Sequence, residues 1–200
     1  MTLIFIVLLM DLLFPFIIAI PYKGYSHKKT VMSMLGTKKS PLGWLYNLWM
    51  VISGFVMIYF GYVLFSYYNF IEHPLALALL ILFFLYGIGD EIISGLFTLN
   101  ENKEDLTLSS IIHSIGSALG FTALQFAPLV LALLQFEAKE IFFGISSVIF
   151  FILSLISFAF FIIGEKLKFQ NTFLSLEGLW QRLALLFMYC PFITWILYKL

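Results

Sequence analysis

The chain has 200 residues, of which 62% are hydrophobic and only 11% are charged. A soluble domain carries about 25% charged residues, and a soluble fold of this length could not bury so much apolar surface in one core. Basic and acidic side chains balance at 11 each, which argues against a nucleic-acid binder because such proteins carry a basic excess. The composition therefore predicts an integral membrane protein.

Six apolar runs are long enough to span a bilayer core as a helix, which takes about 20 residues. In chain order they are Thr2–Tyr22, Leu42–Phe70, Pro74–Phe97, Ser109–Phe136, Ile141–Gly164 and Leu179–Tyr198. Sustained polar-apolar alternation is absent, which disfavours a transmembrane barrel, whereas helices satisfy their own backbone hydrogen bonds in lipid. We therefore predict an all-α, polytopic bundle of about six transmembrane helices that forms one domain over residues 1–200.

Basic residues concentrate in the three odd-numbered connections between these runs. They are Lys23, Lys28, Lys29, Lys38 and Lys39 in the first, Lys103 in the third, and Lys166 and Lys168 in the fifth. Only Lys139 and Lys199 belong to the other side. Because basic loops remain in the cytoplasm, we expect a multi-pass protein of the cell membrane with both termini outside.

Polar residues recur near the basic end of several predicted spans. They are Asn47, Asp90, Glu91, Ser94, His113, Ser117 and Arg182. At a rise of 1.5 Å per residue, most lie roughly 5–12 Å from the same membrane face. A hairpin between the third and fourth spans would place Glu91 opposite Ser114, so that Glu91 and His113 can face each other. We also expect Arg182 to pair with Asp90 or Glu91, because a buried charge needs a partner.

Gly116 and Gly120 form a small-xxx-small pair, which predicts close helix packing beside this polar cluster. Two interpretations of the cluster remain open. It is either a structural ion pair that fixes helix register, or the wall of a cytoplasm-facing cavity for a polar head group.

Asp11 lies near the middle of the first span, apart from the polar cluster. No Lys or Arg precedes this span, so we expect a retained helix and not a cleaved signal peptide. We predict a neutral, structural Asp11 that is hydrogen-bonded to a tyrosine such as Tyr59 or Tyr62, because an unpaired carboxylate at this depth is costly.

The sequence contains no recognisable cofactor or metal motif. HExxH, HxxxH, P-loop and GxSxG patterns are absent, and the lone Cys190 excludes an internal disulfide and CxxC chemistry. His27 and His73 fall in predicted loops on opposite sides, which leaves only His113 in a helix and no facing pair for haem. We expect no cofactor.

Four short segments carry a resemblance to a known family. They are Met32–Gly36, Gly89–Phe97 with its Ser94-Gly95-Leu96-Phe97 end, Ile112–Ser117, and Gly178–Arg182. Their order and spacing resemble those of the bacterial membrane proteins catalogued as domain of unknown function 998. The pattern departs at Thr98, where a proline is expected, and in the acidic pair Asp90-Glu91. The resemblance implies a bundle of six or slightly more spans and no established activity.

Three functions are compatible with the sequence. The first is binding of a lipid head group or small amphiphile at the polar cluster, with membrane lipids as partners. The second is an enzyme acting on a lipid head group, with His113 and Glu91 or Asp90 as acid and base and Arg182 on a phosphate. The third, a small transporter, is disfavoured because no inverted repeat is visible.

Overall fold

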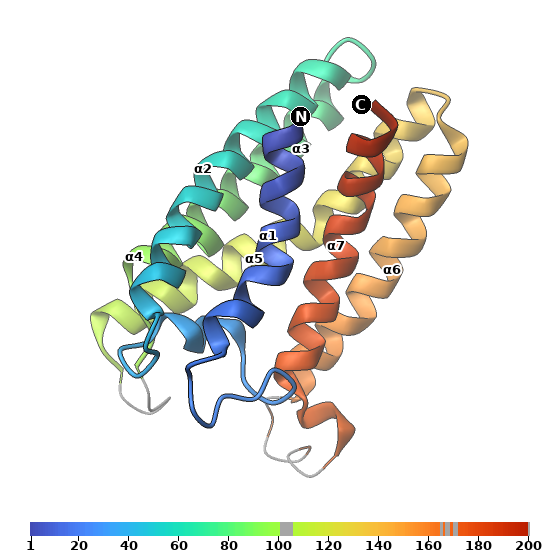
Figure 1. The fold of residues 1–200 in the computed structure, drawn as a ribbon. Coiled ribbons are helices and arrows are strands. Elements are labelled where there is room, and N and C mark those ends of the chain that lie inside the picture. The colour runs from blue at the N-terminus through green and yellow to red at the C-terminus, as the bar shows by residue number, and fades with distance from the viewer. Residues whose placement is uncertain (101–105, 165, 167–168, 170–171, 200) are drawn as a thin grey trace.

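The computed structural model describes residues 1–100, 106–164, 166, 169 and 172–199, which form a bundle of long helices (Figure 1). The long helices are α1 (Thr2–Ala19), α2 (Gly43–Tyr68), α3 (His73–Tyr86), α5 (Leu108–Glu137), α6 (Ile141–Gly164) and α7 (Glu177–Lys199). Shorter elements are the 3-10 helices η1 (Met32–Gly36) and η4 (Phe173–Ser175), the π-helix η2 (Gly87–Ile93), and α4 (Ser94–Leu96).

Six helical stretches are long and apolar enough to cross a membrane, and α3, η2 and α4 together form the third of them. The predicted fold class and number of spans are therefore confirmed. The boundaries differ most at the end of the first span, where α1 ends at Ala19 and not at Tyr22. Large apolar side chains such as Phe55, Ile81 and Ile149 are exposed on the outside of the bundle, as a lipid-facing surface requires.

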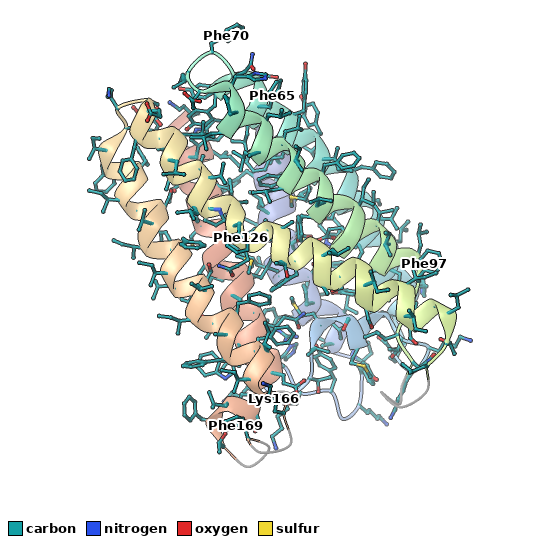
Figure 2. The ribbon with its side chains drawn as sticks, turned by 180° about the vertical axis from the view of Figure 1, so that it is seen from behind. Phe65, Phe70, Phe97, Phe126, Lys166 and Phe169 are labelled. Atoms are coloured by element: carbon teal, nitrogen blue, oxygen red, sulfur yellow. The ribbon has the colours of Figure 1, made fainter. Side chains whose placement is uncertain are left out.

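Both termini lie at one end of the bundle, and the long connection between α1 and α2 lies at the other (Figure 1). Figure 2 shows Phe70, in the connection between α2 and α3, at the end opposite to Lys166. The described basic residues of the first and fifth connections thus share one end, while Lys103 and Lys168 lie outside the described residues. Which end faces the cytoplasm stays a prediction.

Local signals define the helices that carry the polar cluster. Thr107 and Ser110 form a capping box at the start of α5, in which each side chain accepts a hydrogen bond from the other residue's backbone N–H, so α5 begins less than two turns before His113. Pro74 occupies the first turn of α3, where its missing N–H costs nothing.

Glycines bring α2, η2 and α5 into direct backbone contact. A Cβ atom on Gly87 would lie 2.7 Å from the carbonyl oxygen of Gly54, and one on Gly89 would lie 2.6 Å from that of Gly116. A Cβ on Gly120 would collide with Asp90, so the close packing predicted for Gly116 and Gly120 is confirmed. The segment η2 is held between two helices, which fixes its acidic residues in the bundle interior.

Candidate functional site

The two acidic residues of the third span lie in the π-helix η2. A π-helical segment accommodates more residues per turn than an α-helix and often occurs at functional sites. Asp90 accepts a hydrogen bond of 2.6 Å from Ser117 Oγ on α5, whereas the Cβ of Glu91 packs against Gly54 of α2. The hairpin prediction that placed Glu91 opposite α5 is therefore corrected: Asp90 makes that contact, because the π segment changes the register assumed for a regular α-helix.

A small cavity of about 40 Å³ lies at this junction, with room for about two or three water molecules. Six of the seven predicted site residues line it, namely Asn47, Asp90, Glu91, Ser94, His113 and Ser117. Glu91 and His113 are only 3% and 4% exposed. The shared depth deduced from the sequence thus corresponds to a shared wall of one cavity.

Arg182 does not line this cavity, and the predicted ion pair with Asp90 or Glu91 is wrong. Its guanidinium group donates instead to the backbone carbonyls of His27 (2.8 Å), Thr30 (3.3 Å) and Gly178 (2.8 Å), and to Tyr25 Oη (2.7 Å). The first connection folds back over the start of α7 and supplies these oxygens. The depth of Arg182 in the membrane, inferred from the sequence, does not indicate the path of this connection.

Asp11 has different partners from those expected, and it is not separate from the cluster. Its carboxyl group accepts hydrogen bonds from Trp49 Nε1 (2.6 Å) and Ser53 Oγ (2.8 Å) on α2, and it lines the small cavity. Tyr59 and Tyr62 are 57% and 58% exposed, because they lie on the lipid-facing side of α2. The i, i+4 spacing of Trp49 and Ser53 indicates that both lie on one face of α2. This spacing does not indicate which neighbouring helix packs against that face.

A pair of buried tyrosines connects Asp11 with Glu91, and no sequence pattern indicated this connection. Tyr189 Oη of α7 lies 3.0 Å from Asp11 Oδ2 and 2.6 Å from Tyr86 Oη. Tyr86 Oη lies 2.5 Å from Glu91 Oε1. The two tyrosines are at most 1% exposed, so this chain of hydroxyl groups is shielded from lipid.

His113 is oriented by a backbone contact at the end of the third span. Its Nδ1 lies 2.7 Å from the carbonyl oxygen of Phe97. A carbonyl only accepts, so Nδ1 carries a hydrogen, and Nε2 is the acceptor when the ring is neutral. In this state the imidazole offers a hydrogen-bond acceptor to the site.

A second, large cavity of about 480 Å³ adjoins the small one. Both cavities are lined by Ser33, His113, Ser117, Phe121 and Gln181. Away from these shared residues, the large cavity has an apolar wall that includes Phe158, Phe161 and Ile162 of α6, and its lining also includes polar side chains such as Ser114 and Glu177. The small cavity is therefore polar and acidic, and the large one has an apolar wall on α6.

Three carboxyl groups line the small cavity, those of Asp11, Asp90 and Glu91. No lysine or arginine of the described residues lines it. Nor do His, Cys, Asp or Glu side chains gather in threes at a possible metal position anywhere in the described part of the chain. The site is consequently rich in hydrogen-bond acceptors and poor in cationic groups.

In the loop that closes the small cavity, outside the spans, Tyr25 and His27 have shifted pKa values. Burial, opposed by the nearby Arg182, raises the pKa of the Tyr25 hydroxyl. Burial and then the charge of Arg182 lower the pKa of His27. His27 Nδ1 lies 3.3 Å from Arg182 Nη2, an arrangement that requires a neutral imidazole to accept the hydrogen bond.

The four segments that carry the family resemblance meet around the two cavities. Gln181 accepts a hydrogen bond of 2.7 Å from the backbone N–H of Met32, which joins the last segment to the first. Phe97 and Asp90 contact His113 and Ser117, which joins the second to the third. Segments far apart in the sequence thus form one structural unit.

Comparison with known proteins gives one match. Residues 5–198 match the model of a family described as protein of unknown function (DUF998), which confirms the resemblance. None of the curated proteins and none of the solved structures matches the chain.

Proposed function

The chain belongs to the DUF998 family of unknown function, and from that premise we propose that it binds an amphiphile taken from the membrane. The polar head of this molecule occupies the small cavity and its apolar part occupies the large one. The observation that carries the proposal is the junction of the two cavities at His113, Ser117 and Phe121.

The large cavity suits an apolar chain in size and in lining. Its volume of about 480 Å³ falls within the roughly 300–1,000 Å³ typical of small-molecule sites. Phe158, Phe161 and Ile162 offer apolar contact to a hydrocarbon chain. His113, Ser117 and Gln181 are polar residues shared by both cavities, as expected for a site that orients an amphiphile.

The small cavity favours a head group that donates hydrogen bonds. Carboxyl oxygens of Asp90 and Glu91 and the Nε2 atom of His113 are acceptors, and the described lining offers no cation for a phosphate. An ammonium or hydroxyl head matches these acceptors. The enzyme hypothesis assigned a phosphate to Arg182, whose donors are turned to the first connection, so we favour binding over lipid-phosphate chemistry.

The place of the site along the membrane normal follows from the basic loops. The cavities lie near the lysine-rich end of the spans, which the positive-inside rule assigns to the cytoplasm. In the cell membrane, the protein would then take its ligand from the inner leaflet or from the cytoplasmic surface.

Native mass spectrometry and lipid analysis of the purified protein test the proposal. Ala118 lines the large cavity, so Ala118→Trp should block it. Ala159→Trp, at an exposed position of α6, is the matched control. We expect a co-purifying amphiphile with the parent chain and with Ala159→Trp, and its loss from Ala118→Trp. Equal retention by all three proteins, or no bound molecule in the parent, would overturn the proposal.

A further inference from the structure

The hydrogen-bonded chain between Asp11 and Glu91 needs one more hydrogen than its tyrosines supply. Its three O–O separations are 3.0, 2.6 and 2.5 Å, so each contact requires a hydrogen between its two oxygens. The hydroxyl groups of Tyr189 and Tyr86 contribute one hydrogen each. The third must come from a carboxylic acid at one end of the chain.

The two carboxyl groups differ in the donors that surround them. Asp11 has Trp49 Nε1 at 2.6 Å and Ser53 Oγ at 2.8 Å in addition to its tyrosine. Glu91 is hydrogen-bonded to Tyr86 and has the Ser53 hydroxyl nearby, but that hydroxyl donates to Asp11. The Oε2 atom of Glu91 is buried without a hydrogen-bond partner among the described residues. An ionised carboxylate with an unpaired buried oxygen is far more costly than a neutral acid. The ionised form is therefore better accommodated at Asp11, and the extra hydrogen belongs on Glu91.

Neighbouring groups on the other helices do not replace this hydrogen. On η2 and α5, Asp90 is hydrogen-bonded to Ser117, and His113 directs its Nδ1 hydrogen to Phe97. On α2, Tyr46 also lines the cavity, but the hydrogen bonds of Asp11 and Glu91 in the described residues go to other side chains. Within the described lining there is no lysine or arginine that could balance a second negative charge.

We infer that Asp11 and Glu91 form a proton-binding site in which they share a single proton, carried by Glu91. Both tyrosine hydroxyls then point along the chain toward Asp11. The proton reaches Asp11 when the Glu91 O–H bond breaks toward Tyr86, the Tyr86 hydrogen passes to Tyr189, and the Tyr189 hydrogen passes to Asp11. The total charge stays the same, and no other reactant is needed.

The proton-binding site borders the small cavity on one side. Asp11, Tyr86 and Glu91 all line that cavity, whereas the positions one turn beyond Asp11 and Tyr189 are the buried apolar residues Leu8 and Phe192. The described chain of polar groups therefore stops in the middle of the bundle. This arrangement stores a proton beside the cavity and exchanges it there.

Infrared spectroscopy of the purified protein at pH 8 tests the inference through the C=O stretch of protonated carboxyl groups. Two samples carry ¹³C in the side-chain carboxyl of either all glutamates or all aspartates. Asp90→Asn serves as the background, because it removes the third carboxyl group of the small cavity and keeps an oxygen acceptor for Ser117. We expect one protonated carboxyl band that shifts only with labelled glutamate. Glu91→Gln should abolish the band, and Glu72→Gln, at the opposite end of the bundle, should retain it.

Each other outcome contradicts the inference. A band that shifts with labelled aspartate places the proton on Asp11. Bands from both labels mean two protons, and the absence of any band means that both acids are ionised. If Glu91→Gln does not fold, the isotope labels still decide the assignment. The protein is delipidated before the measurement, so the result is independent of the proposed function.

Discussion

Arg182 donates a hydrogen bond of 2.8 Å to the backbone carbonyl of His27, which ties the start of α7 to the first connection. The same connection contains η1, and its residues Met32 and Gly36 line the small cavity. The half-buried guanidinium group therefore holds the segment that closes the site, although it does not enter the site itself.

Arg182→Ala should lower the free energy of unfolding by about 2–3 kcal/mol, as expected for hydrogen bonds made by a charged group. Lys166→Ala, at an exposed position near the same end, should change it by less than about 0.5 kcal/mol. Denaturant titration in detergent measures both. A loss of stability as small as that of the control would contradict the role given to Arg182.

A double-mutant cycle separates this role from the ion pair that the sequence suggested. Arg182 and Glu91 share no hydrogen-bond partner, so the effects of Arg182→Ala and Glu91→Gln should add within about 0.5 kcal/mol. A coupling energy above about 1 kcal/mol would contradict this expectation and support the ion pair instead.

Stability should depend on pH through His27. Burial and Arg182 lower the pKa of His27 in the folded protein, so below the ordinary value of about 6.5 the unfolded chain binds the extra proton first. The contribution of neutral His27 to stability is present above this pH and is lost as the pH falls below it. The melting temperature should decline from pH 7.5 to pH 5.5 more for the parent than for His27→Gln. Equal declines would contradict the prediction.

The contact between α2 and η2 should not tolerate a methyl group. Gly87→Ala places a Cβ 2.7 Å from the Gly54 carbonyl oxygen, which should cost about 1–3 kcal/mol as overpacking does. Gly54→Ala strains the same contact from the other side. The double variant should therefore lose less stability than the sum of the two single losses. Additive losses, measured by denaturant titration, would show that the two glycines do not share one contact.

Sequence patterns predicted the depth of the polar residues in the membrane well, because hydropathy and a rise of 1.5 Å per residue determine the position of a helical residue along the membrane normal. Six of the seven chosen residues reached the same cavity for this reason. Rotation about each helix axis was poorly determined, because helices that are apolar all round do not mark their buried face. Asp11 was therefore assigned to exposed tyrosines, and its true partner on α7, Tyr189, was missed.

Two further differences have local causes. The π-helix changes the helical register within η2. The two glycines of Gly87-Ile88-Gly89 were the only sequence signal for this irregularity. The first connection contains no hydrophobic periodicity, so the contact between its carbonyls and Arg182 could not be predicted.

Orientation is testable with single cysteines in a Cys190→Ser background. Lys38 lies in the first connection, and Phe70, 92% exposed, lies at the opposite end of the bundle. An impermeant maleimide added to intact cells should label Phe70→Cys, and should label Lys38→Cys only after the membrane is permeabilised. Labelling of Lys38→Cys in intact cells would reverse the assigned orientation.

The melting temperature of delipidated protein with three single-chain probes tests the binding site most directly. Dodecylamine, dodecanol and dodecyl phosphate share a tail and differ in the head group. Binding to the folded state alone stabilises it by about 2.7 kcal/mol at 100 times Kd. We predict that the amine and the alcohol raise the melting temperature of the parent and of Ala159→Trp, that the phosphate does not, and that Ala118→Trp responds to none. An equal response of Ala118→Trp, or a rise with the phosphate alone, would contradict a tail cavity joined to an acceptor-rich head site.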